Sequence, residues 1–131
     1  MADKVLIDTS VWISFFRGKD LSLIERIAGL LKSGKAAYTG IIALELVNGA
    51  KSRKELEVLY DAFDTMHRMP VSETTFFSAG RLGYEIARKG HTLSAVDLLI
   101  AQTAIENDVV LMTYDEHFSI IAQHSVLALL K

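Results

Sequence analysis

The chain has 131 residues, 50% of them hydrophobic, with a single proline and a formal net charge of −2 at pH 7. This length and composition predict one folded domain over residues 1–131 and exclude a largely disordered chain. The lack of cysteine excludes disulfides, thiolate metal sites and a cysteine nucleophile. No apolar stretch approaches the roughly 18 residues of a membrane-spanning helix, and the N-terminus has no signal-peptide pattern. We therefore expect a cytoplasmic protein with no membrane partner.

The first half of the chain alternates short apolar runs with helical patterns. Residues 4–7 form a continuous, β-branched run typical of a buried strand. Leu23, Ile27 and Leu30 follow helical spacing, and Gly34 comes after them as a stop signal. In chain order we predict a strand at 4–7, helices at 11–16 and 21–31, a strand at 36–39, and helices at 41–47 and 52–66.

The second half repeats this alternation. Pro70 favours an edge position for a strand near it, because proline has no N–H to donate to a neighbouring strand. Gly90 follows two basic residues, in the order that helix C-termini prefer. In chain order we predict an edge strand at 69–71, helices at 74–89 and 94–107, a strand at 109–112, a short helix ending near 122, and a last strand at 126–129.

Strands that alternate with helices predict an α/β fold in which a parallel sheet is covered on both faces. In such folds ligands bind beyond the carboxyl ends of the strands, where the strand order reverses. Asp8 directly follows the first predicted strand, and Asp115 lies three residues beyond the strand at 109–112. If these two strands are neighbours, their carboxylates converge.

Two further acids share helical faces with apolar residues. Asp97 lies on one stripe with Ile100, Ala101 and Ala104. Glu45 follows two isoleucines at helical spacing, near the start of the helix that leaves the second strand. Both helices are predicted to flank the same end of the sheet.

Each acid also has an ordinary structural interpretation. Asp8 and Asp115 precede short helices and are candidate N-caps. Asp97 stands three residues after Ser94, close to a capping-box arrangement, and Glu45 suits a helix surface. These alternatives stay open for each residue taken alone.

Four carboxylates at one sheet edge would repel one another strongly. At about 5 Å and an effective dielectric constant of about 20, each pair costs roughly 3 kcal/mol, which a bound cation would offset. Without cysteine, and with no histidine at an obvious ligand spacing, the donors are oxygens only. Such a set favours Mg²⁺ or Mn²⁺ over Zn²⁺.

The segments that carry these acids resemble a known family. In order, "DTSVWI", "ELVNG", "DLLIAQTAIEND" and "LMTYDEHF" are similar to the motifs of PIN-domain ribonucleases, in particular the VapC-type toxins of toxin-antitoxin pairs. The resemblance covers nearly the whole chain. Its motif residues are Asp8 with Thr9 and Ser10, Glu45 with Gly49, Asp97 with Ile100 and Ala101, and Thr113, Asp115, His117 and Phe118.

This resemblance implies a PIN-like three-layer α/β/α sandwich with a parallel sheet of about five strands. It also implies a Mg²⁺- or Mn²⁺-dependent endoribonuclease, a homodimer, and inhibition by a VapB-like antitoxin whose C-terminal segment enters the cleft. The catalytic and metal-binding residues would be Asp8, Glu45, Asp97 and Asp115. Thr9, Ser10 and Thr113 are possible supporting residues that orient ligands or a phosphate, with capping or turn formation as the alternative.

The net negative charge argues at first against an RNA partner. With four of the 16 acids assigned to a metal, however, 12 remain against 14 basic residues. Lys51, Arg53, Lys54 and Arg17 are candidates for contacts with backbone phosphates, or for an ordinary solvated patch.

Other side chains and other functions remain open. The aromatic residues Trp12, Phe15 and Phe16 are core candidates, or contacts for an antitoxin or a second copy. His117 suits a structural role at a helix start, with a general base as the alternative. Alternative functions are a PIN nuclease in RNA processing, a PIN-like binding module without turnover, and a phosphoryl-accepting receiver-like module, for which a second acid beside Asp8 is missing.

Overall fold

The computed structural model describes residues 3–130 and is built around a parallel sheet. Its strands are β1 (Val5–Ile7), β2 (Ala36–Tyr38), β3 (His67–Arg68) and β4 (Val110–Met112), in the order β3-β2-β1-β4. β1 is central, because Leu6 pairs with Ala37 on one side and with Leu111 on the other. All three residues of β1 are buried, as expected for a parallel strand that is covered on both faces.

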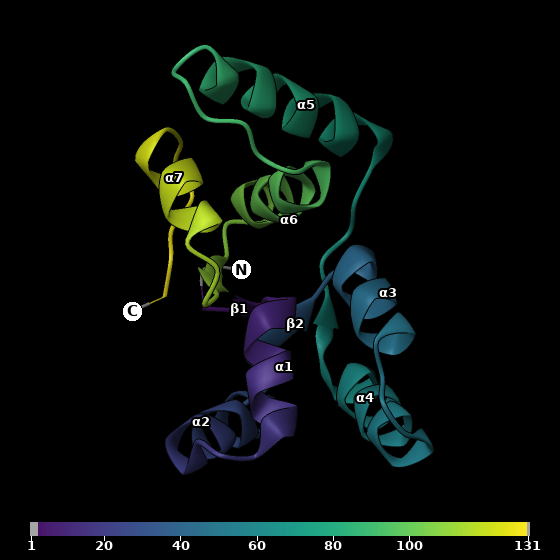
Figure 1. Ribbon diagram of the computed structural model, residues 1–131. Coiled ribbons are helices and arrows are strands. Elements are labelled where there is room, and N and C mark those ends of the chain that lie inside the picture. Colours follow the sequence, from purple (N-terminus) through teal and green to yellow (C-terminus); the bar gives the residue numbers. More distant parts are fainter. Residues whose placement is uncertain (1–2, 131) are drawn as a thin grey trace.

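The segments that connect the strands form helices, and these helices flank the sheet (Figure 1). In chain order they are α1 (Thr9–Arg17), α2 (Leu21–Lys32), α3 (Gly40–Asn48), α4 (Arg53–Thr65), α5 (Glu73–Ala87), α6 (Ala95–Glu106) and α7 (His117–Gln123). α5 lies along α6 at the top of Figure 1, whereas α1 and α2 lie at the bottom and α3 and α4 at the right. The predicted α/β fold with a parallel sheet is confirmed. Within residues 3–130, every helix is too short or too polar to cross a lipid bilayer.

The fifth strand predicted at 126–129 is reduced to a single bridge. Leu111 donates to Ala128 O at 2.9 Å and accepts from Leu130 N at 2.8 Å, which pairs Leu111 with Leu129. Successive residues of a strand direct their backbone groups to opposite neighbours. β4 has three residues and uses its two outer ones toward β1, so that only Leu111 faces the C-terminal segment.

The predicted edge strand is also displaced along the chain. β3 is the edge strand of the order given above, but it occupies His67–Arg68 instead of residues 69–71. Met69 N donates the last hydrogen bond of this pairing, to Tyr38 O at 2.8 Å. The next residue is Pro70, which has no N–H with which to continue the ladder.

Helix starts coincide with side chains that accept hydrogen bonds from the first turn. N-cap side chains serve five helices: Asp8, Asp20, Ser52, Ser72 and Ser94. Each satisfies a backbone N–H that the helix itself leaves unpaired. At the other end of α1, Gly18 adopts φ 68°, a left-handed conformation that disfavours residues with a Cβ. Residues close in sequence to each helix thus determine where that helix begins or ends.

The core lies between the sheet and its helices. Trp12 of α1 and Phe118 of α7 are its largest fully buried side chains. Trp12 contacts the rings of Phe15 and Phe16, which are themselves partly buried. Of the interpretations offered for this aromatic cluster, the structure supports a core role for Trp12. Through the buried ring of Phe118, α7 packs against the core of the domain, which also positions the loop that precedes this helix.

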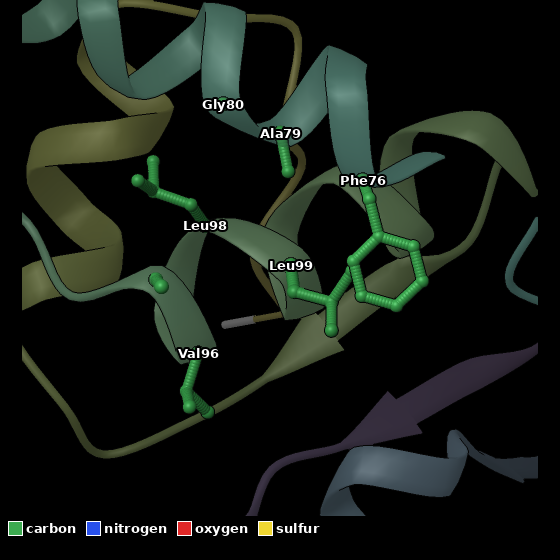
Figure 2. Close-up of a pocket in the computed structure, with 7 residues that line it drawn as sticks. Phe76, Ala79, Gly80, Val96, Leu98 and Leu99 are labelled. Atoms are coloured by element: carbon green, nitrogen blue, oxygen red, sulfur yellow. The ribbon is translucent and has the colours of Figure 1, made fainter. Parts of the chain in front are cut away.

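A largely apolar hollow lies between α5 and α6 (Figure 2). Its volume is about 230 Å³, and Phe76, Ala79, Val96 and Leu99 are among its lining residues. A second hollow shares Phe76 and Leu99 and extends the apolar surface toward α3 and β3. Phe76 is 58% exposed and Phe77, the next residue of α5, is 73% exposed. Apolar surface of this kind usually marks a contact with another macromolecule or ligand.

Truncation of Phe118 is expected to destabilise the fold strongly. We expect Phe118→Ala to lower the free energy of unfolding by about 3–5 kcal/mol, because it removes a fully buried aromatic ring and leaves a cavity. Denaturant unfolding measures this change. The matched control Leu21→Ala removes an exposed side chain and should change the value by less than about 0.5 kcal/mol. Similar effects of the two substitutions would contradict the assignment of Phe118 to the core.

Candidate metal centre at the ends of β1 and β4

Asp8 is the residue at which β1 ends and α1 begins. Its backbone N–H donates to Met112 O at 2.9 Å, so the pairing with β4 continues to this residue. The side chain belongs to a residue that is only 5% exposed. Its Oδ2 accepts from Ser10 Oγ at 2.7 Å, from Thr113 Oγ1 at 2.9 Å and, at 3.4 Å, from Ser10 N. Within residues 3–130, the hydrogen bonds of this carboxylate all go to Oδ2, which leaves Oδ1 free for another ligand.

The two hydroxyls that bind Asp8 also hold the loop after β4. Ser10 Oγ accepts from the backbone N–H of Tyr114 at 3.0 Å, and Thr113 Oγ1 accepts from that of Asp115 at 3.0 Å. Each hydroxyl therefore donates to the carboxylate and accepts from the loop. Ser10 and Thr113 connect Asp8 to the backbone that positions Asp115.

Asp97, Asp115 and His117 form one group of possible metal ligands. One donor atom from each lies within 4.8 Å of the other two. His117 Nδ1 is 3.3 Å from Asp115 Oδ1 and 3.5 Å from Asp97 Oδ2. The Asp97 side chain is 16% exposed, so this carboxylate lies in the least solvated part of the group. α6 contributes Asp97, the loop after β4 contributes Asp115, and His117 is the first residue of α7.

The electrostatics of this group disfavour its fully ionised form. Burial raises the pKa of Asp97, and the negative charges of Asp115 and Asp8 raise it further. A hydrogen bond with Ser94 and the proximity of His117 act in the opposite direction. The influence of Asp8 on Asp97 indicates that the carboxylates from β1, α6 and the loop after β4 share one electrostatic environment. A cation among them would relieve this repulsion.

Glu45 reaches the same region from α3 through Thr9. Thr9 Oγ1 donates to Glu45 Oε1 at 2.8 Å, and Thr9 is the residue that follows Asp8. The side chain of Glu45 is partly buried. Glu45 is therefore hydrogen-bonded to the residue next to Asp8. It is not a member of the group of possible ligands, which within residues 3–130 consists of Asp97, Asp115 and His117.

The capping roles predicted as alternatives coexist with this arrangement. Asp8 caps α1 by accepting from Ser10 N. Ser94 caps α6 by accepting from Asp97 N at 3.1 Å. The N-cap of α7 is Glu116 instead of Asp115, whose Oδ1 accepts from His117 N at 2.9 Å. Oδ1 of Asp8 stays available for a metal, and Oδ1 of Asp115 has a second lone pair beside the one that accepts from His117 N.

The sequence predicts a structural role for His117 at a helix start, with a general base as the alternative. It is the first residue of α7, and its Nδ1 also faces two of the acids. Sequence spacing does not predict this orientation, because spacing alone does not show toward which neighbours the first side chain of a helix points. The available signals are the sequence "DEH" at 115–117 and the motif of the resemblance, which includes His117.

The donors fit a divalent cation. Carboxylate oxygens from Asp97 and Asp115 converge with an imidazole nitrogen, and the charge of Asp8 adds to the causes that raise the pKa of Asp97 in the ion-free group. Hard cations such as Mg²⁺ and Mn²⁺ prefer carboxylate and water oxygens. Neither apolar hollow described above is lined by any of these residues.

The fold and the site together define an α/β protein whose acidic centre lies at the carboxyl ends of two adjacent parallel strands. The chain belongs to the PIN domain family, whose model matches residues 5–123.

Known proteins with similar sequences are ribonucleases by name. The VapC ribonuclease Mb1587 of Mycobacterium bovis is 28% identical over 123 residues, which cover 91% of this chain and 92% of that protein. Ribonuclease VapC1 of Methanocaldococcus jannaschii is 27% identical over 116 residues, covering 88% of this chain and 79% of that protein.

Solved structures share the fold. DNA-bound VapBC from Salmonella typhimurium matches with a TM-score of 0.78 and 21% identity, over 97% of this chain and 96% of that chain. VapBC2 from Rickettsia felis, bound to a promoter DNA fragment, matches with a TM-score of 0.76 and 24% identity, over 96% of both chains. The shared fold thus extends over nearly the whole length of the chain.

The raised pKa of Asp97 leads to a prediction for the metal-free protein. Above the folded-state pKa, the folded protein carries an unfavourable charge that the unfolded chain solvates freely, and this penalty disappears as the pH falls through that pKa. Asp97→Asn should therefore raise the melting temperature by a few degrees at about pH 7, and the difference should shrink toward about pH 4.

Thermal unfolding in the presence of a chelator measures this effect. Asp64→Asn, at an exposed position of α4, is the matched control and should leave the melting temperature nearly unchanged. A lower melting temperature for Asp97→Asn at neutral pH would show that the carboxylate stabilises the ion-free fold.

Proposed function

We propose that this protein is a divalent-metal-dependent endoribonuclease and the toxin of a VapBC-type toxin-antitoxin pair. The observation that carries the proposal is the convergence of Asp97 and Asp115, coupled to Asp8, at the strand ends of a PIN domain. The names of the similar ribonucleases and of the VapBC complexes support both parts of the proposal.

The residues that would hold the metal are Asp8, Glu45, Asp97 and Asp115. A bound Mg²⁺ or Mn²⁺ supplies Lewis-acid chemistry: it lowers the pKa of a coordinated water and neutralises phosphate charge. Oxygen donors and the repulsion within the group support this assignment.

The protein's own contribution is to keep the acids in place. Ser10 and Thr113 engage Oδ2 of Asp8, so that Oδ1 is the oxygen directed to a ligand. Thr9 holds Oε1 of Glu45 and orients its carboxylate in the same way. We propose these three hydroxyl residues as positioning residues, because each binds a carboxylate that would otherwise rotate freely.

The reaction that we propose is hydrolysis of an RNA phosphodiester bond. The oxygen of water bonds to phosphorus while the bond from phosphorus to the 3′ oxygen breaks, and a proton passes to the leaving oxygen. The products are a 5′-phosphate end and a 3′-hydroxyl end. Four exposed basic residues are proposed to contact backbone phosphates: Lys51 between α3 and α4, Arg53 and Lys54 at the start of α4, and Arg17 at the end of α1.

Substitution of Asp8 tests this function directly. Asp8→Asn is expected to reduce RNA cleavage at least about 100-fold, since it removes a negative charge from the proposed metal centre. Sequencing of RNA ends after expression of each variant measures cleavage and identifies the phosphorylated end. Asp64→Asn is the control and should cleave like the wild type.

RNA profiles that are identical for wild type and Asp8→Asn would contradict nuclease activity. Cleavage without growth arrest would favour an RNA-processing nuclease over a toxin.

The proposed partners are a VapB-like antitoxin and a second copy of the chain. We propose that the second copy binds at α5, because the exposed rings of Phe76 and Phe77 lie on the same helix that lines the hollow. A projecting ring and a hollow on one helix can be self-complementary, as a two-fold interface requires. The acidic centre would remain outside this contact, since none of its residues lines the hollow.

A charge placed on α5 should separate the copies. Phe77→Asp is expected to weaken dimerisation at least about 100-fold, because the interface would bury an unpaired carboxylate. Sedimentation over a range of protein concentrations measures the dimer fraction, with Tyr60→Asp on the exposed face of α4 as the control. A wild-type protein that stays monomeric at high micromolar concentration would exclude the dimer.

A further inference from the structure

The imidazole of His117 lies at the edge of the proposed metal centre. Its Nδ1 is 3.3 Å from Asp115 Oδ1 and 3.5 Å from Asp97 Oδ2, and the three donor atoms form one mutually close group. The inference drawn from this position rests on the proposed function, because it assigns a role toward the divalent ion.

These separations are unlike those of a strong ion pair. Charge-assisted hydrogen bonds between nitrogen and a carboxylate are about 2.7–2.9 Å long, and both distances are clearly longer. The His117 side chain is also 62% exposed. An ion pair of this kind therefore contributes little to the stability of the fold.

The same separations match donors arranged around one ion. Two ligands at about 2.1 Å from a metal are about 3.0 Å apart at a right angle and about 3.4 Å apart at a tetrahedral angle. The two distances from Nδ1 are within a few tenths of an ångström of this range. Asp115 and His117 lie where the loop after β4 meets the start of α7, and Asp97 lies in the first turn of α6, so the group is assembled from two separate segments.

We propose that His117 Nδ1 is a metal ligand beside the carboxylates of Asp97 and Asp115. The ring then binds in its neutral form, with the proton on Nε2 and the lone pair of Nδ1 directed to the ion. Mg²⁺ prefers oxygen ligands, whereas first-row transition metals also accept imidazole nitrogen. The mixed set of donors makes the site selective for a transition metal such as Mn²⁺ over Mg²⁺.

The affinities for Mn²⁺ and Mg²⁺, measured by calorimetry without RNA, test this selectivity. His117→Ala is expected to raise the Kd for Mn²⁺ at least about tenfold and that for Mg²⁺ by less than about threefold. In His117→Asn the amide Oδ1 replaces Nδ1 at the same distance along the side chain. This variant should retain binding of both ions and lose the preference for Mn²⁺. His91→Gln, at an exposed position between α5 and α6, is the control and should leave both Kd values unchanged.

Pulsed electron paramagnetic resonance of the Mn²⁺-loaded protein tests the ligand itself. Wild type and His91→Gln should show coupling of the ion to one imidazole nitrogen, and His117→Ala and His117→Asn should lack it. Absence of this coupling in the wild type, or equal losses for Mn²⁺ and Mg²⁺ in His117→Ala, would overturn the assignment.

The two proposals fail in different ways. If the nitrogen coupling is missing while RNA cleavage still depends on Asp8, the role of His117 is wrong and the nuclease stands. If the wild type binds neither ion, both the ligand assignment and the proposed metal centre are wrong.

Discussion

The contact between Asp8 and the hydroxyls of Ser10 and Thr113 organises this end of the sheet. It joins residues 105 positions apart, at 2.9 Å from Thr113 Oγ1 to Asp8 Oδ2. Both hydroxyls also accept from backbone N–H groups of the loop after β4. Because each hydroxyl donates to Oδ2 and accepts from the loop, this oxygen of the buried carboxylate is satisfied without a basic partner, while Oδ1 accepts no hydrogen bond within residues 3–130. The placement of Asp115 and His117 depends on this contact.

The remaining constraint is the repulsion among carboxylates that the fold brings together. Burial and neighbouring charge raise the pKa of Asp97, so the fully ionised form of the ion-free group is disfavoured. The cap at α1 occupies Oδ2 of Asp8 and leaves its Oδ1 unused, and the backbone N–H of His117 donates to Oδ1 of Asp115. One oxygen of a carboxylate can therefore cap a helix while the other stays free for a ligand, as in Asp8. An observed N-cap hydrogen bond does not argue against metal binding by the same side chain.

The acidic centre and the apolar hollow lie in different parts of the molecule. The acidic centre lies at the strand ends, whereas the apolar hollow lies between α5 and α6 (Figures 1 and 2). This separation means that a partner bound at α5 need not cover the carboxylates. It also allows the two proposals, on RNA cleavage and on dimerisation, to be tested with variants that do not share residues.

The sequence by itself determined the α/β class, the order of the elements and the positions of the four acids, because hydrophobic period, caps and strand ends act over a few residues. It placed the edge strand two residues late and overestimated the C-terminal strand. Only the tertiary structure decided that His117 faces Asp97 and Asp115, and that Glu45 is joined to Thr9. These contacts depend on strand order and on the direction of single side chains across distant segments, which no local pattern contains.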